Sequence, residues 1–312
     1  MTDSLRIQCE LLTENQLILK KHFRFESAYM LQVVACIYAS AKALADPDKI
    51  AAALSLIKSK TGVFSHFRSS TRIVLAAIIS LDPEPEKLLD KVLDEYSKLK
   101  LHFRTSTYLP LTACLLVKHG NANEKSIKEY FSSLKPLRPI FGLENDVVFA
   151  TLYTVFGKAS KYTVSDVEFY TKELSQKFPK YSSKIAARIL ALGETRGLDE
   201  RFCKLKELLD ESNVKIGKGV EMASLAPFAL LDTPIEEIEE KLWEFLDHFE
   251  KASKNPKLFY GKQRTSFAAW LLYGELIKNT DVRSYELAKD ASFSVLLANA
   301  VNMTAAQHSA AL

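Results

Sequence analysis

The chain repeats itself about every 37 residues, and this period limits its possible folds more than any other feature of the sequence. The tripeptide His-Phe-Arg occurs at residues 22–24, 66–68 and 102–104. Two copies continue alike, as HFRSSTRIVLAAIIS and HFRTSTYLPLTACLLV, and later segments keep the spacing while the letters diverge. Self-similarity at such a period is typical of stacked repeat units that bury a continuous core between neighbours.

Each repeat unit contains one apolar segment, which we call an A helix, with an alanine at a fixed place. These alanines are Ala77, Ala113, Ala150, Ala187, Ala226 and Ala269, after a less regular first copy centred on Ala35. Amphipathic stretches, the B helices, lie between them with one apolar stripe at helical spacing. One such stripe consists of Ile235, Ile238, Leu242, Phe245 and Phe249. Because alternation with a period of two is absent, we expect no strands.

We therefore predict an all-α fold of about seven helical hairpins, either an open α-solenoid or a closed α/α toroid. The first helix (5–20) and the last helix (285–301) depart from the pattern, as capping helices do. Residues 1–312 are predicted to form a single helical-repeat domain. The five alanines at 77, 113, 150, 187 and 269 are expected to be buried at close helix–helix contacts.

Proline positions predict where helices begin and break. Asp46-Pro47, Asp82-Pro83 and Thr233-Pro234 each place a capping side chain before a proline at the first helical position, which is typical of a B-helix start. Pro227 lies inside the apolar run 222–231, where it removes a backbone hydrogen bond and should interrupt the helix.

Composition excludes several classes of protein. A net charge of +4 is too small for a clustered nucleic-acid-binding face, so nucleic acid is an unlikely partner. The longest apolar stretch (27–41) is too short to span a bilayer, and no secretory signal opens the chain, so we expect a cytoplasmic protein without a membrane partner. The four cysteines form no CxxC pair and are interpreted as buried thiols.

Signatures of cofactor and metal chemistry are missing. The chain has no GxGxxG, GxxxxGK[ST], HExxH, GxSxG or DDxxD motif, and none of its six histidines has another histidine or a cysteine three or four residues away. We therefore expect no cofactor and no metal.

The size, the helical repeat and one segment together resemble a bacterial protein family, the domain-of-unknown-function family 4003. The segment runs from Val63-Phe64 through Arg68-Ser69 into Leu75-Ala76-Ala77. This resemblance covers most of the chain and implies no activity.

The starts of the A helices are rich in basic and hydroxyl residues, and equivalent positions of a repeat line up along one edge. Such a row, beside the N–H groups of helix N-termini, suits an anionic ligand or a peptide or protein partner. The candidate ligand-binding residues are Arg24, Arg68, Arg72, Arg104, Arg264, His66 and His102. A structural interpretation stays open beside this one: the hydroxyls cap helices, and the arginines bond loop carbonyls.

Two further functions use the same helix starts. Carboxylates there could serve as acid and base in a glycosidase-like α/α-toroid hydrolase, and the candidates are Glu26, Glu144, Asp146 and Glu221. Only Trp243 and Trp270 are present to stack on a sugar. Single-stranded RNA binding, read one base per repeat, is the third possibility, and it requires polar positions that recur strictly in every copy.

Overall fold

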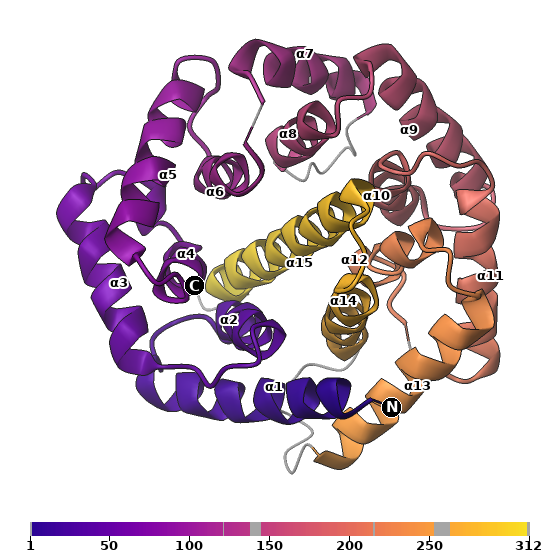
Figure 1. Cartoon of the computed structure of the whole chain (residues 1–312), viewed down its shortest axis with the longest axis horizontal. Helices are drawn as coiled ribbons and strands as arrows, with labels where there is room; N and C mark the ends of the chain where they lie inside the picture. Colours follow the sequence, from indigo (N-terminus) through magenta and orange to yellow (C-terminus); the bar gives the residue numbers. More distant parts are fainter. Residues whose placement is uncertain (1, 121, 138–144, 215, 253–262, 311–312) are drawn as a thin grey trace. The chain divides into compact units, whose positions relative to one another are not determined.

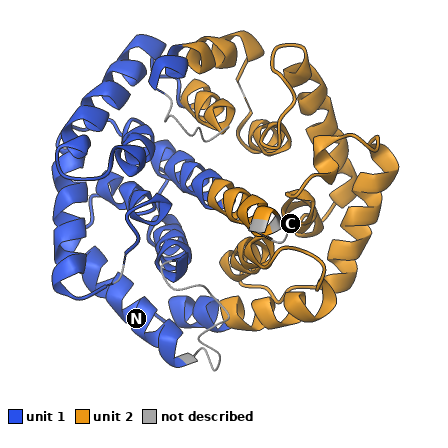
Figure 2. Cartoon of the chain, turned by 180° about the vertical axis from the view of Figure 1, so that it is seen from behind, with its two compact units in different colours: residues 1–10, 133–143, 156–296 blue, residues 11–132, 144–155, 297–312 orange. Residues whose placement is uncertain are grey.

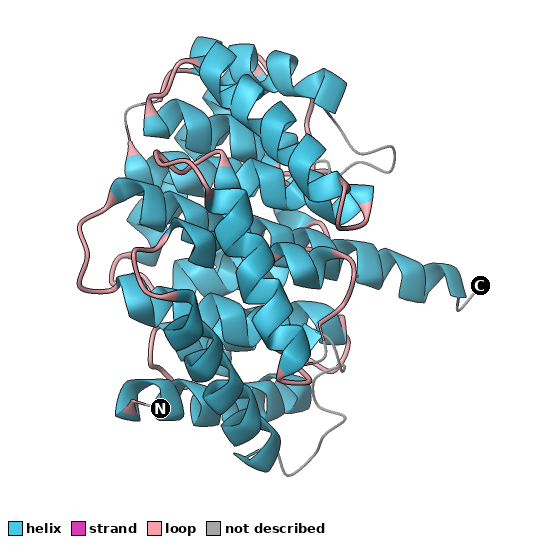
Figure 3. Cartoon of the chain, turned by 90° about the vertical axis from the view of Figure 1, so that its right-hand side faces the viewer, coloured by secondary structure: helices cyan, strands magenta, loops and turns pink. Residues whose placement is uncertain are grey.

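The computed structural model describes the whole chain except residues 1, 121, 138–144, 215, 253–262 and 311–312, so the prediction for Glu144 lies outside the described residues. The described residues form helices and loops, with no strand among them (Figure 3). The predicted all-α class is confirmed.

Two kinds of helix alternate along the chain (Figure 1). The amphipathic B helices are α1 (Asp3–His22), α3 (Pro47–Lys60), α5 (Pro85–Lys100), α7 (Glu124–Leu134), α9 (Ser160–Ser175), α11 (Leu198–Glu211) and α13 (Ile235–Ala252). The apolar A helices are α2 (Ala28–Ser40), α4 (Arg72–Ser80), α6 (Leu109–His119), α8 (Asp146–Phe156), α10 (Lys180–Leu190), α12 (Val220–Ala223) with η3 (Ala226–Leu230), and α14 (Gln263–Ile277). This alternation is compatible with the predicted hairpin repeat.

The chain packs as two compact units (Figure 2). Unit 1 comprises residues 1–10, 133–143 and 156–296, and unit 2 comprises residues 11–132, 144–155 and 297–312. In unit 2, α4 packs against α2 and α3, while α5 packs against α6. In unit 1, α9 packs against α10, and α13 packs against α11 and α14. Within each unit, B helices therefore cover A helices and also contact the next B helix.

The alanines of the repeat lie where the sequence predicts. The side chains of Ala77, Ala113, Ala150, Ala187 and Ala269 have no exposed surface. Their small size lets the A helices approach their neighbours closely, since any larger side chain would occupy space already filled at the density of a protein interior. The predicted burial is confirmed.

Of the three predicted helix starts, the one at Asp46-Pro47 is confirmed, whereas α13 begins at Ile235, one residue after the predicted Pro234. The Asp46 carboxylate accepts hydrogen bonds from the Asp48 and Lys49 amides at 3.1 Å, and α3 begins at Pro47 as predicted. The Asp82-Pro83 prediction is wrong, because the Asp82 carboxylate accepts from the Glu84 amide at 2.8 Å in a turn before α5, which begins at Pro85.

Pro227 breaks its helix as predicted. α12 ends at Ala223, and a short 3-10 helix, η3 (Ala226–Leu230), carries the proline in its first turn. A proline is tolerated there because the first helical N–H groups have no intrahelical acceptor.

α15 (Arg283–Ala310) differs from a capping helix in one respect. A cap keeps a polar outer face in water, whereas every residue from 291 to 298 in α15 is buried. Ser292 and Ser294 are buried among the apolar residues of this stretch. The helix contributes residues 283–296 to unit 1 and the rest to unit 2.

Candidate functional site

In two of the three His-Phe-Arg tripeptides, the phenylalanine is part of the core. Phe67 is fully buried and meets Tyr96 of α5 edge-to-face, with ring centroids 5.0 Å apart. Phe103 meets Phe131 of α7 in the same way at 5.4 Å. The tripeptides at 66–68 and 102–104 thus each join one hairpin to an aromatic ring of the B helix that follows, whereas Phe23 of the first tripeptide is only partly buried.

Arg68 is bonded to the backbone of the turn that precedes it. Its guanidinium donates to the carbonyl oxygens of Lys58 and Thr61, and its Nε donates to the Thr61 hydroxyl at 3.2 Å. These bonds satisfy carbonyl groups at the end of α3, which a helix leaves without intrahelical donors. The bonds of Arg68 therefore fit the structural interpretation, in which the arginine bonds loop carbonyls and holds the loop.

The other arginines of unit 2 are placed differently. Arg104 is exposed, and no hydrogen bond or ion pair engages its side chain among the described residues. Arg24 is also exposed, with its guanidinium carbon 5.1 Å from the ring centroid of Phe25. Arg72 forms an ion pair with Glu26 at 2.7 Å, which ties the start of α4 to the turn before α2.

Capping does not account for the hydroxyls at these A-helix starts. Ser27 and Thr71 precede α2 and α4, yet neither side chain bonds an N–H group of its helix. The Ser27 hydroxyl instead lies 2.7 Å from the Thr304 hydroxyl, and Ser69 pairs with Thr71 at 3.1 Å.

The turns that connect B helices to A helices in unit 2 expose large apolar side chains. Phe64, Phe25, Leu101 and Val63 have exposed fractions of 99%, 90%, 82% and 75%, the four highest of any large apolar side chain that the structure describes. We call these turns, residues 22–27, 61–66 and 100–106, the turn edge. Because exposing apolar surface to water costs free energy, a cluster of this kind makes the turn edge a candidate interaction surface.

A pocket of about 440 Å³ lies on the turn edge. One wall is the turn 60–66, which includes His66, and the other is the face of α5 formed by Leu93, Tyr96, Ser97 and Lys100. The Lys100 ammonium lies 5.6 Å from the centroid of the Tyr96 ring. Burial raises the pKa of the Tyr96 hydroxyl, so the pocket carries a cation but no competing anion from this residue.

Charge separates the two ends of the hairpins in unit 2. The three connections from B to A helices (22–27, 61–72 and 100–108) contain the charged residues Arg24, Arg68, Arg72, Lys100, Arg104 and Glu26. The connections at the other end (41–48, 81–86 and 117–124) contain Lys42, Lys118, Asp46, Asp48, Asp82, Glu84, Glu86 and Glu124. The turn edge is therefore the cationic end, and its one acid is already paired with Arg72.

The remaining predicted site residues are scattered. His102 is half-buried in the turn edge, and Arg264 lies in unit 1, at the start of α14, where it lines a second pocket. The sequence did not single out Lys100, Phe64 or Leu101 as site residues. One sequence signal was available for Phe64 and Leu101. Both are apolar residues in the connection between two helices and belong to the apolar stripe of neither helix, so no core position is expected for them.

The four carboxylates of the hydrolase hypothesis lie in different surroundings. Glu26 is paired with Arg72, and Asp146 is buried in the first turn of α8, where a negative charge meets the helix N-terminus favourably. Glu221 lies in unit 1 at the start of α12, with its carboxylate over Gly217. Glu144 lies outside the described residues.

No disulfide joins the four cysteines, all of which the structure describes. Cys9, Cys36 and Cys203 are buried as predicted, whereas Cys114 keeps some exposed surface although burial of its thiol group raises its pKa. The described residues contain no group of three or more His, Cys, Asp or Glu side chains that could hold a metal ion together. None of the described helices combines the length and the apolarity that a bilayer crossing requires.

Comparison with known proteins gives one match. The model of a family described as "Protein of unknown function (DUF4003)" matches residues 16–303 of the chain, which confirms the resemblance drawn from the sequence. No curated protein and no solved structure matches the chain.

Proposed function

Because the chain belongs to the DUF4003 family, whose description assigns no ligand, we propose a function from the turn edge itself. The protein is a helical-repeat binding protein, and its partner is an acidic segment of a peptide or protein that also presents large apolar side chains. The observation that carries this proposal is the gathering of the four most exposed large apolar side chains at the cationic end of unit 2.

The two kinds of side chain alternate along the turn edge. Arg24 lies beside Phe25 in the first turn, and Lys100 and Arg104 flank Leu101 in the third. The pocket between Phe64 and Lys100 offers an apolar wall and an ammonium group within one cavity. A small inorganic anion would use the cations and leave the apolar side chains in water, so the pair of features favours a peptide-like partner.

Lys60 is not expected to contribute to binding of such a partner, because its charge is already paired within the fold. Its ammonium bonds the carboxylates of Asp90 at 2.6 Å and Glu86 at 2.9 Å, and these bonds raise its pKa. The cations that remain without a carboxylate on the turn edge are Arg24, Lys100 and Arg104, and they set the expected electrostatic contribution to binding.

The test uses fluorescence anisotropy on the full chain with a short labelled peptide rich in Glu, Asp and Leu. We expect saturable binding that weakens as salt rises from about 0.1 M to about 1 M, since the screening length falls from about 10 Å to about 3 Å. The double variant Lys100→Ala/Arg104→Ala should weaken binding about ten-fold, which corresponds to about 1.4 kcal/mol. Phe64→Ala should also weaken it without changing the melting temperature, because Phe64 makes almost no contact within the fold.

The matched control is Lys125→Ala, which removes an exposed cation at the opposite end of the unit 2 hairpins and should leave the affinity unchanged. A peptide in which Lys replaces Glu and Asp should not bind. The proposal fails if the acidic and basic peptides bind equally, if Phe64→Ala and the double variant bind as the wild type does, or if only anionic lipid vesicles bind the chain.

A further inference from the structure

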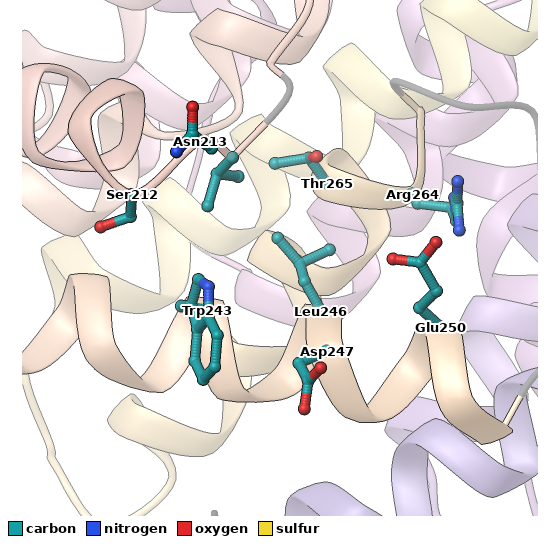
Figure 4. Close-up of a pocket in the computed structure, with 9 residues that line it drawn as sticks. Ser212, Asn213, Trp243, Leu246, Asp247, Glu250, Arg264 and Thr265 are labelled. Carbon is teal, nitrogen blue, oxygen red and sulfur yellow. The ribbon is translucent and has the colours of Figure 1, made fainter.

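A second pocket, in unit 1, has walls of a different character (Figure 4). It has a volume of about 290 Å³ and lies between α13, the turn after α11 and the start of α14. Trp243, Leu246, Asp247 and Glu250 line it from α13. These positions are separated by three, four and seven residues from the first, so they form one face of the helix. This face is distinct from the buried stripe of α13, which contacts the core.

Trp243 is the main apolar surface of this pocket. Its side chain is half exposed, and 46% of the residue faces solvent. The other tryptophan, Trp270, is buried and donates its indole N–H to the Lys289 carbonyl at 3.1 Å. A flat indole left open beside a cavity offers a platform on which a ligand ring can lie.

The polar groups of the pocket nearly cancel in charge. Asp247 is paired with Lys251 at 2.6 Å. Figure 4 shows the Glu250 carboxylate pointing toward the Arg264 guanidinium at the end of the pocket opposite Asn213. A charged ligand therefore meets no uncompensated partner, whereas hydroxyl groups can both donate to a carboxylate and accept from a guanidinium.

Asn213 adds an amide at the rim. Its backbone has φ 59°, in the left-handed region, where asparagine is tolerated better than most residues. The side-chain amide carries one acceptor and two donors, and none of these is engaged by another described residue. The amide is thus available to a ligand that lies on Trp243.

We infer that this pocket binds a neutral polyhydroxylated ring, the chemistry of a sugar residue. One apolar face of the ring would lie on the Trp243 indole, and its hydroxyl groups would bond the Asn213 amide. Glu250, about two helical turns along α13 from Trp243, and Arg264 would meet a substituent of the ring. The volume suits a single ring, since typical small-molecule pockets begin at about 300 Å³. This inference concerns unit 1 and is independent of the partner proposed for the turn edge.

The experiment is fluorine NMR of the full chain labelled with 5-fluorotryptophan, which gives one resonance for each tryptophan. Methyl glycosides of glucose, galactose, mannose and N-acetylglucosamine are the probes. We expect at least one of them to shift the Trp243 resonance saturably, with half-saturation near 1 mM, the affinity of about −4.1 kcal/mol that a few contacts supply. The Trp270 resonance should stay in place and serve as the internal control. The Trp243→Phe variant assigns the resonances.

Two variants measured by calorimetry test the assigned contacts. Asn213→Gly removes the amide while glycine keeps the left-handed backbone, so the fold is retained and affinity should fall about ten-fold. Trp243→Ala should abolish binding, and Trp243→Phe should restore part of it. The inference is overturned if no glycoside moves the Trp243 resonance, if glycine or glutamate moves it equally well, or if Asn213→Gly and Trp243→Ala bind as the wild type does.

Discussion

The two pockets occupy the same place in the hairpin repeat but differ in chemistry. In unit 2 the pocket lies between the turn after α3 and residues 93, 96, 97 and 100 of α5. In unit 1 it lies between the turn after α11 and residues 243, 246, 247 and 250 of α13. Both sets of four have the same spacing on a B helix. In these two hairpins a cavity therefore forms beside the same four helical positions, and the side chains at those positions decide what it can hold.

The turns that complete the two pockets are also held differently. Arg68 bonds the end of α3 and the turn beside the unit 2 pocket. In unit 1, the Ser212 hydroxyl at the end of α11 bonds the Glu239 carboxylate, and Asn213 supplies the left-handed residue of the turn. Side-chain bonds from Arg68 therefore hold the turn in unit 2. In unit 1, the turn is held by the left-handed backbone of Asn213 and by the bond from Ser212 to Glu239 of α13.

The largest effect should come from breaking the turn beside the unit 2 pocket. Arg68→Ala removes three bonds from a charged donor, so we expect the free energy of unfolding to fall by about 2–3 kcal/mol. Arg104→Ala is the matched control from the third tripeptide, and its effect should stay within about 0.5 kcal/mol. Urea unfolding of both variants measures the difference. Equal losses would show that the two arginines have the same role.

Overpacking should have a smaller effect and should be alike in both units. Ala113→Leu in unit 2 and Ala187→Leu in unit 1 each add a larger side chain where no surface is exposed. We expect each to destabilise the fold by about 1–3 kcal/mol. Ala52→Leu, at an exposed position of α3, is the control and should be nearly neutral in thermal unfolding. A neutral Ala187→Leu beside a costly Ala113→Leu would mean that the repeat packs differently in unit 1.

The smallest effect concerns one thiol in each unit. Burial raises the pKa of Cys9 and of Cys114 from the ordinary 9.0 to about 12. Because the folded pKa lies above the unfolded one, the stability linked to each thiol is complete below about pH 9 and is lost as the pH rises toward 12. Alkylation at pH 8, followed by mass spectrometry, should be slow at both residues in the folded chain and fast in urea. Rapid alkylation of only one of the two cysteines without urea would show that its thiol is accessible in the folded chain, so that the two units differ in this respect.

The fold could be predicted because its signals are local and repeated. Apolar stripes at helical spacing, alanines about 37 residues apart and a proline inside an apolar run each reflect a physical constraint on a helix. Asp82-Pro83 misled us for an equally local reason: the sequence 82–85 contains two prolines, and the helix begins at the second.

The site was harder to predict because identical tripeptides lie at different distances from the end of the preceding helix. Residues 61–65 separate α3 from the first of the two similar tripeptides, so carbonyl groups seven and ten residues before Arg68 lie at a helix end. α5 extends to Lys100, so the corresponding positions before Arg104, Ser97 and Asp94, lie inside the helix. The Asp94 carbonyl is bonded within the helix there, and Arg104, which bonds neither position, is left for another partner. The length of the preceding helix, which the tripeptide does not encode, decides the role of its arginine.

The sharing of α15 between the two units has a consequence for synthesis on the ribosome. Residues 283–296 complete unit 1 and residues 297–310 belong to unit 2, yet both segments are translated after every other described helix. At about 5–20 residues per second, the nascent chain spends many seconds with the faces that will bury α15 still open to water. Neither unit can reach its final packing before this helix emerges. A chain that stops short of α15 is therefore marked as incomplete in both units, and its open apolar faces make it a substrate for chaperones and proteases.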